Sequence, residues 1–158
     1  EWYAQYASYT RATLEALAEA LDVELETASL PELPPSERAR LFDLLEADLR
    51  DQRLPAAADD YQRSRVHMTL RLAAILRNVE QLGPALREQE REDLGQLLGR
   101  RPSSREDGER ALEQLVQESG ARREEALLRY FHRQARREEH LLRGALGAGE
   151  QAVFQRLF

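Results

Sequence analysis

Apolar residues recur at spacings of three and four positions along most of this chain, a repeat typical of helices that bury one face. Leucine and alanine fill most of these positions, and glutamate and arginine lie between them. All four are strong helix formers, whereas β-branched residues are scarce and Ile75 is the only isoleucine. No segment alternates polar and apolar residues as a strand would. The pattern therefore predicts an all-α fold.

Proline, glycine and polar runs interrupt this repeat and predict a bundle of about six helices. The expected ranges are 2–27, 35–52, 59–82, 84–99, 104–119 and 121–146, followed by an apolar cluster at Val153, Phe154, Leu157 and Phe158. Gly83 and Pro84 are expected to end the third helix, because proline cannot continue one.

Two of the predicted helices carry the clearest apolar stripes. The third has the wider one, so we expect this helix at the centre of the core, with the following residues inward: Tyr61, Met68, Leu72, Ile75, Val79 and Leu82. The stripe of the first helix consists of Trp2, Tyr6, Tyr9, Thr13, Leu17 and Ala20.

Charge is distributed unevenly along the 158 residues. Residues 1–34 contain seven acids and a single base, Arg11, which gives this segment the whole net charge of −6. Prolines between Ser29 and Pro35 separate it from the remainder, where acids and arginines balance. We therefore expect an acidic N-terminal helix with a proline-rich linker at 1–34 and a bundle body at 35–158. An acidic total argues against nucleic acid as a partner.

Several chemistries are excluded by the residue types alone. The chain has no cysteine, so disulfides, thiolate nucleophiles and cysteine-based zinc sites cannot form. All basic residues are arginine, which excludes a Schiff-base lysine and a P-loop lysine. The loss of lysine, with abundant alanine, arginine and glycine, suggests a GC-rich bacterial genome.

Targeting signals are not visible either. No apolar run approaches the roughly 20 residues that span a bilayer, which predicts no membrane partner. The first residues resemble no signal peptide, so the default expectation is a cytoplasmic protein. A chain that begins with Glu1 is expected to be processed or a fragment.

The third predicted helix carries a polar row of Arg63, His67 and Arg71. A spacing of four puts the three side chains on one face of a helix. Two guanidinium groups that flank an imidazole could hold a phosphate or a carboxylate. The alternative is a solvated face, or arginines that pair with acids on a neighbouring helix.

A second row lies on the last predicted helix, where His132, Arg136 and His140 fall in one line. This row could form an anion site, or a groove in which an acidic helix docks, and residues 1–34 of the same chain are one such helix. The alternative is pairing within the helix to its own glutamates, at 124, 125, 138 and 139.

Motifs for metals and cofactors are not found. A carboxylate-bridged metal centre in a bundle needs Glu-x-x-His pairs, but the residues three positions before the histidines are Ser64, Arg129 and Arg137. The glycines at 144–149 are in the wrong order for a phosphate loop and follow no strand. We therefore expect no metal, no cofactor and no catalytic residues, although a triad assembled only in space stays open.

Four of the ten aromatic residues cluster near the start, at Trp2, Tyr3, Tyr6 and Tyr9. Such a group suits either a core or a self-association face. Our leading hypothesis is a non-catalytic interaction or accessory domain that acts through helix packing on a protein partner or a second copy. The alternative is a regulatory bundle that binds an anionic small molecule, and an enzyme is a third, weaker hypothesis.

One segment resembles a known family. Residues 83–99, which begin Gly83-Pro84-Ala85 and end Leu97-Leu98-Gly99, resemble the "GPA…LLG" segment of a small bacterial helical family of unknown function. Genes of that family often lie beside those of an acyl-CoA dehydrogenase and an aminoglycoside-phosphotransferase-like kinase. The resemblance implies an accessory role near acyl-CoA metabolism and no catalytic residues.

Overall fold

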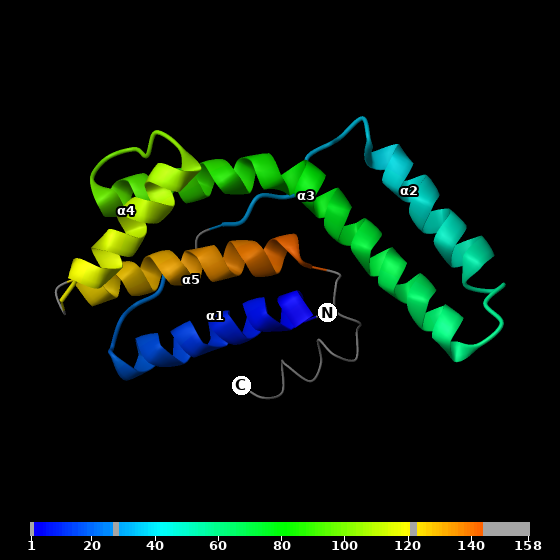
Figure 1. The fold of residues 1–158 in the computed structure, drawn as a ribbon, viewed down its shortest axis with the longest axis horizontal. Helices are drawn as coiled ribbons and strands as arrows, with labels where there is room; N and C mark the ends of the chain where they lie inside the picture. The colour runs from blue at the N-terminus through cyan, green and yellow to red at the C-terminus, as the bar shows by residue number, and fades with distance from the viewer. Residues whose placement is uncertain (1, 27–28, 121–122, 144–158) are drawn as a thin grey trace. The chain divides into compact units, whose positions relative to one another are not determined.

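The computed structural model describes residues 2–26, 29–120 and 123–143, with side chains from Gln5 onward. These residues form five α-helices and one π-helical segment, η1 (Figure 1). The bounds are α1 Trp2–Ala20, α2 Ala39–Asp48, η1 Leu49–Arg53, α3 Asp60–Leu98, α4 Arg105–Glu118 and α5 Glu124–Leu141. No strand occurs in this part of the chain. The all-α prediction is confirmed, with five helices in place of about six; the predicted apolar cluster at 153–158 lies outside the described residues.

The helix count differs because Pro84 lies inside α3 and does not end it. The predicted third and fourth helices are therefore one helix of 39 residues. Proline removes a single backbone donor and crowds the carbonyl four residues earlier, and neither effect touches the rest of the hydrogen-bond ladder. Leu82 and Leu86, on either side of the proline, are both buried.

The first helix ends earlier than predicted. Asp22 adopts a left-handed conformation with φ of 54°, and the backbone N–H of Val23 donates to the Ala18 carbonyl at 2.8 Å. This turn closes the helix with a backward hydrogen bond of the kind that commonly ends helices, so the acidic residues after Asp22 leave the helix.

Contacts divide the chain into two compact units. Of the described residues, the first unit holds 2–5, 32–84 and 139–143, and the second holds 6–26, 29–31, 85–120 and 123–138. The sequence-based division after residue 34 does not coincide with this one, because α1 lies mostly in the second unit. No helix in the described ranges combines the length and apolar character needed to cross a membrane.

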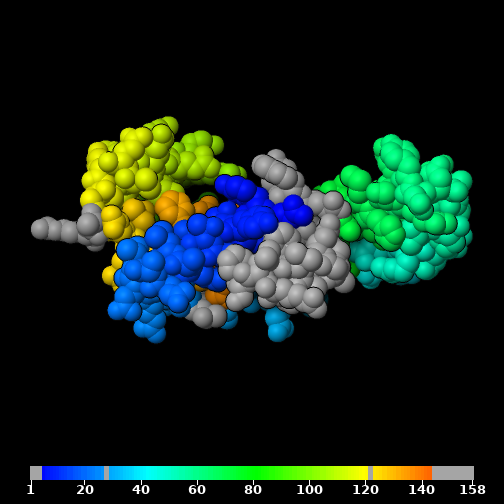
Figure 2. Space-filling view, turned by 90° about the horizontal axis from the view of Figure 1, so that it is seen from below, coloured from blue at the N-terminus to red at the C-terminus, as the bar shows by residue number. Residues whose placement is uncertain are grey.

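In the first unit, α2 lies beside the first half of α3 (Figures 1 and 2). The guanidinium of Arg77 on α3 lies 3.1 Å from the Glu46 carboxylate and 3.9 Å from that of Asp43, both on α2. The hydroxyl of Ser36 donates to the Glu80 carboxylate at 3.0 Å. These contacts show that α2 packs on the face of α3 that contains Arg77 and Glu80. Ala73 lies on the same face and is buried.

The apolar stripe predicted as the core centre lies largely on the surface of α3. Leu72 is 53% exposed, and three further members of the stripe are exposed as well: Tyr61, Met68 and Val79. Ile75 is half-buried, and Leu82 is buried. The prediction is wrong because α2 packs on the neighbouring face with Ala73, about 100° around the helix from Leu72. Spacing alone does not say which of two faces a neighbour covers.

In the second unit the most buried helix is α5, rather than α3. Its buried residues are Leu128, Tyr130, His132, Ala135 and Arg137. Burial raises the pKa of Tyr130 to about 12. Leu86 and Leu94 are buried in the second half of α3.

The first helix buries its alanine face in this unit. The buried residues are Ala7, Ala12 and Ala18, while Tyr6, Tyr9 and Leu17 are exposed. Figure 2 shows the side of α1 that faces away from α5 open to solvent. The aromatic stripe is therefore not core, because the small side chains allow the closer approach.

Asn78 connects two distant segments within the first unit. This buried amide donates from Nδ2 to the carbonyls of Leu141, at 3.0 Å, and Arg143, at 2.9 Å. It thereby satisfies two carbonyls at the end of α5 that have no partner in the helix.

We expect Asn78→Ala to lower the free energy of unfolding by about 2 kcal/mol, because two carbonyls lose their donor. Asn78→Asp should lower it further, since a carboxylate faces the same carbonyls with no donor. Urea unfolding measures both, with the exposed Gln52→Ala as the control. Wild-type stability of Asn78→Asp would contradict this role.

Candidate functional site: an arginine pocket beside α5

Acidic residues from the start of the chain contact α5 within the second unit. Glu15 lies 3.3 Å from Nε2 of His132, and Glu26 lies 4.0 Å from the guanidinium of Arg133. Arg129 donates from Nε to the backbone carbonyl of Glu24 at 3.0 Å. Of the row that the sequence singled out, His132 takes part in these contacts, and Arg129 also pairs with Glu125 one turn earlier on α5.

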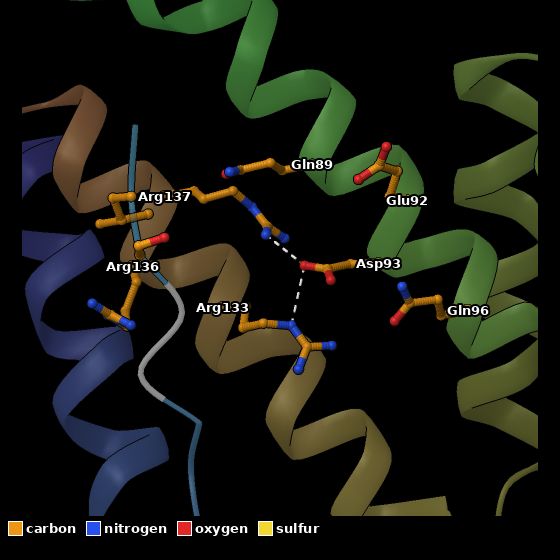
Figure 3. A pocket seen from close by; sticks show the side chains of 9 residues that line it. Gln89, Glu92, Asp93, Gln96, Arg133, Arg136 and Arg137 are labelled. Atoms are coloured by element: carbon orange, nitrogen blue, oxygen red, sulfur yellow. Dashed lines mark hydrogen bonds and ion pairs between the residues drawn. The ribbon is translucent and has the colours of Figure 1, made fainter. Parts of the chain in front are cut away.

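A single carboxylate on α3 links two arginines of α5 (Figure 3). Oδ2 of Asp93 accepts hydrogen bonds from Nε of Arg133 at 3.1 Å and from Nη1 of Arg137 at 2.5 Å. The two arginines are four residues apart and therefore lie on the same face of their helix. All three side chains are largely buried, so water screens this contact weakly.

A pocket of about 150 Å³ lies beside this cluster. It is lined by Ser29, Leu30, Gln89, Glu92, Asp93, Gln96, Arg133, Arg136 and Arg137. Figure 3 shows the glutamines and the acids on α3 and the three arginines on α5. Nη2 of Arg137 is buried and has no hydrogen-bond partner in the described structure. Because arginine stays charged at all ordinary pH values, this lining suits the binding of an anion better than proton transfer.

The row predicted on the third helix does not line this pocket. Arg63 is exposed and lies 3.4 Å from the Asp60 carboxylate, one turn earlier on the same helix. His67 is exposed and Arg71 is half-buried. Their spacing puts them on one face of α3, and the pairing of Arg63 follows the solvated alternative.

The other predicted site residues lie in different surroundings. Arg136 lines the pocket, His132 is buried against Glu15, and His140 is half-buried near the end of α5. Tyr6 and Tyr9 are exposed on α1. Trp2 and Tyr3 belong to the first turn of α1, but their side chains lie outside the described part.

Sequence reasoning missed Asp93 and named Arg137 only as the residue three positions before His140. A signal for the arginines existed, since Arg133 and Arg137 repeat at a helical spacing. No signal existed for Asp93, one acid among many, because its partners lie 40 and 44 residues away along the chain.

The electrostatics of Glu15 follow from its contacts. Burial alone would raise the pKa of this carboxyl. Hydrogen bonds from Arg11 and His132, together with their charges, outweigh burial and hold the pKa below its ordinary value of 4.5. The ionised form of Glu15 is therefore favoured in the folded chain.

Comparisons with protein-family models, curated proteins and solved structures found no match to this chain. The resemblance of residues 83–99 to a bacterial helical family stays a prediction. In the described ranges, no group of three or more His, Asp or Glu side chains is arranged to hold a metal ion.

We expect Asp93→Asn to lower the free energy of unfolding by about 3 kcal/mol, because it removes the countercharge of two largely buried guanidinium groups. Chemical denaturation measures the change. The control is Arg105→Gln, which removes a highly exposed ion pair with Glu109 and should leave the denaturation midpoint unchanged. Equal stability of Asp93→Asn and the wild type would contradict the structural role of this cluster.

Because of Glu15, we expect the free energy of unfolding to depend on pH in the acidic range. Because its folded pKa lies below its unfolded value of 4.5, its contribution is present above pH 4.5 and is lost as pH falls through the folded pKa. We therefore expect Glu15→Gln to reduce the loss of stability between pH 7 and pH 3, measured by urea unfolding at each pH. Glu19→Gln, an exposed acid on the same helix, is the control. An unchanged loss in Glu15→Gln would disprove the linkage.

Proposed function

We propose that this chain is a non-catalytic interaction domain that associates with a second copy of itself through helix packing. The observation that carries the proposal is the apolar stripe on the surface of α3. Its members are exposed over more than four helical turns: Tyr61, Met68, Leu72, Leu76 and Val79. They are separated by seven, four, four and three residues, which is the spacing of a seam between two helices. A contiguous apolar surface of this kind is typical of a protein–protein contact.

Charge indicates what covers this stripe. Residues 61–79 contain four arginines and no acid. The segment 1–34 carries a net charge of −6, and α1 has an apolar stripe of its own, in which Tyr6, Tyr9, Leu17 and Leu21 are exposed. Within α1 the charged residues are Arg11, Glu15 and Glu19, a net −1, and most of the acids of this segment follow the helix. An apolar stripe on an acidic segment complements a basic helix with an apolar stripe of its own. A second copy of the chain provides such a segment.

We propose a two-fold arrangement for this pairing. In a two-fold dimer, α1 of each copy would cover α3 of the other, so that the same contact forms twice. Aromatic side chains such as Tyr6 and Tyr9 suit this position, because the ring is apolar while the hydroxyl reaches water at the edge of the contact.

The proposed metabolic role and source of the protein are supported by the sequence alone. An accessory role near acyl-CoA metabolism is supported by the resemblance of residues 83–99, and a bacterial source is supported by composition. The anion-binding alternative at Arg63, His67 and Arg71 has less support, since Arg63 already pairs with Asp60.

Sedimentation equilibrium at micromolar concentration tests the proposal. We expect a wild-type dimer, and we expect Leu72→Gln to weaken the association about tenfold or more, because it replaces an apolar contact in the seam by a polar one. Raising the salt concentration should also weaken the dimer, since opposite charges line the contact.

Leu41→Gln is the matched control. Leu41 is 65% exposed on α2, outside the stripe, so its change should leave the association unaffected. A strictly monomeric wild type would overturn the proposal. A dimer that depends on Leu41 and not on Leu72 would place the interface on α2 and would also overturn it.

A further inference from the structure

We infer that a second pocket, between α4, α5 and the second half of α3, binds a small uncharged molecule of about one ring that carries a hydrogen-bond acceptor such as a carbonyl oxygen. All residues that line this pocket lie between 87 and 134, within the second unit. None of them belongs to the apolar stripe of α3, so this function is separate from self-association. Two observations carry the inference: an apolar lining of matching size and a buried hydroxyl without a partner.

The apolar lining comes from three segments that pack closely. It consists of Leu94 on α3, Pro102 in the loop before α4, Leu112 on α4 and the ring of Tyr130 on α5. Gly108 on α4 is buried, and a Cβ atom at this position would lie only 2.9 Å from Cδ2 of Leu94. The two helices therefore approach each other closely at the pocket, and packed side chains form its apolar surface.

The volume limits the size of the ligand. The pocket holds about 240 Å³. An apolar cavity of about 150 Å³ is enough to bind benzene, whereas sites for drug-sized ligands begin at about 300 Å³. A single ring with one short substituent therefore matches this pocket.

The hydroxyl of Tyr130 is the polar group that such a ligand would contact. Tyr130 is only 1% exposed, and its hydroxyl has no hydrogen bond to another residue in the described structure. The hydroxyl is not fully enclosed, and because Tyr130 lines the pocket, its small exposed area opens into this space. Burial raises the pKa of Tyr130 to about 12, so the hydroxyl keeps its proton and acts as a donor at neutral pH. An acceptor oxygen on the ligand supplies the missing partner.

The charged groups around the pocket favour an uncharged ligand. Arg91 and Arg105 each pair with a glutamate on the same helix, at 3.7 Å and 2.6 Å, and Arg87 is exposed, so water screens its charge. Of the charges that act on the Tyr130 hydroxyl, the carboxylate of Glu90 has the largest effect, and it raises the pKa. A second negative charge beside this hydroxyl would be repelled by Glu90.

Benzamide, added to the full chain at constant ionic strength, is the probe. Acetamide, which has the same amide without the ring, is the reference, and benzoate is the charged analogue. We expect benzamide to raise the unfolding temperature saturably, by about 4 °C at ten times a millimolar Kd, with matching heat in calorimetric titration. Acetamide should have no such effect, and benzoate should bind more weakly than benzamide.

Tyr130→Phe distinguishes a ligand-binding hydroxyl from a structural one. It removes only a hydroxyl that has no partner in the described chain, so the unfolding temperature without ligand should not fall. Benzamide binding should weaken about fivefold, which is the effect of one hydrogen bond. Tyr61→Phe, on an exposed tyrosine of α3 outside the pocket, is the matched control and should bind as the wild type does.

Four results would overturn the inference. Benzamide could bind no more tightly than acetamide, benzoate could bind more tightly than benzamide, or Tyr130→Phe could bind benzamide as the wild type does. A lower unfolding temperature of Tyr130→Phe without ligand would show that the hydroxyl has a partner in the protein. Sedimentation of the same variants measures the dimer separately, so the two proposals can fail independently.

Discussion

The second unit depends on how α5 buries charge. A helix that buries Arg137 and His132 beside Leu128 and Tyr130 cannot pack against an apolar surface alone, because a buried charge without a partner is unfavourable. Asp93 provides the partner from α3, and Glu15 provides the contact from α1. Three segments that are distant in sequence are therefore selected for one another by charge as well as by shape.

Features that depend on neighbouring residues in the sequence could be predicted, whereas features that depend on contacts between distant segments could not. Helix class follows from local propensity and spacing, and so does the start of α4, where the hydroxyl of Ser104 accepts a hydrogen bond from the Asp107 backbone. The effect of Pro84 is not local in this sense. Whether a proline ends a helix depends on the side chains buried around it, and Leu82 and Leu86 are buried only in the fold.

The sequence also does not predict which face of a helix is buried. On α1 the aromatic group suited either a core or a self-association face, and in the structure the alanine side is buried while Tyr6 and Tyr9 are exposed. On α3 the stripe at Leu72 has the better spacing, yet α2 pairs with Arg77 on the next face. A helix with two suitable faces leaves the choice to its neighbours. The Asp93 cluster is a further case, since a contact between residues 40 positions apart has no local pattern.

The arginines of the two units have different surroundings. In the second unit, Arg133 and Arg137 share the largely buried carboxylate of Asp93. In the first, four arginines between residues 61 and 79 flank an apolar stripe; Arg77 pairs with two acids of α2, and Arg63 pairs with Asp60. In the proposed dimer, residues 1–34 of a second copy, which are acidic overall and carry an apolar stripe on α1, complement the stripe of α3.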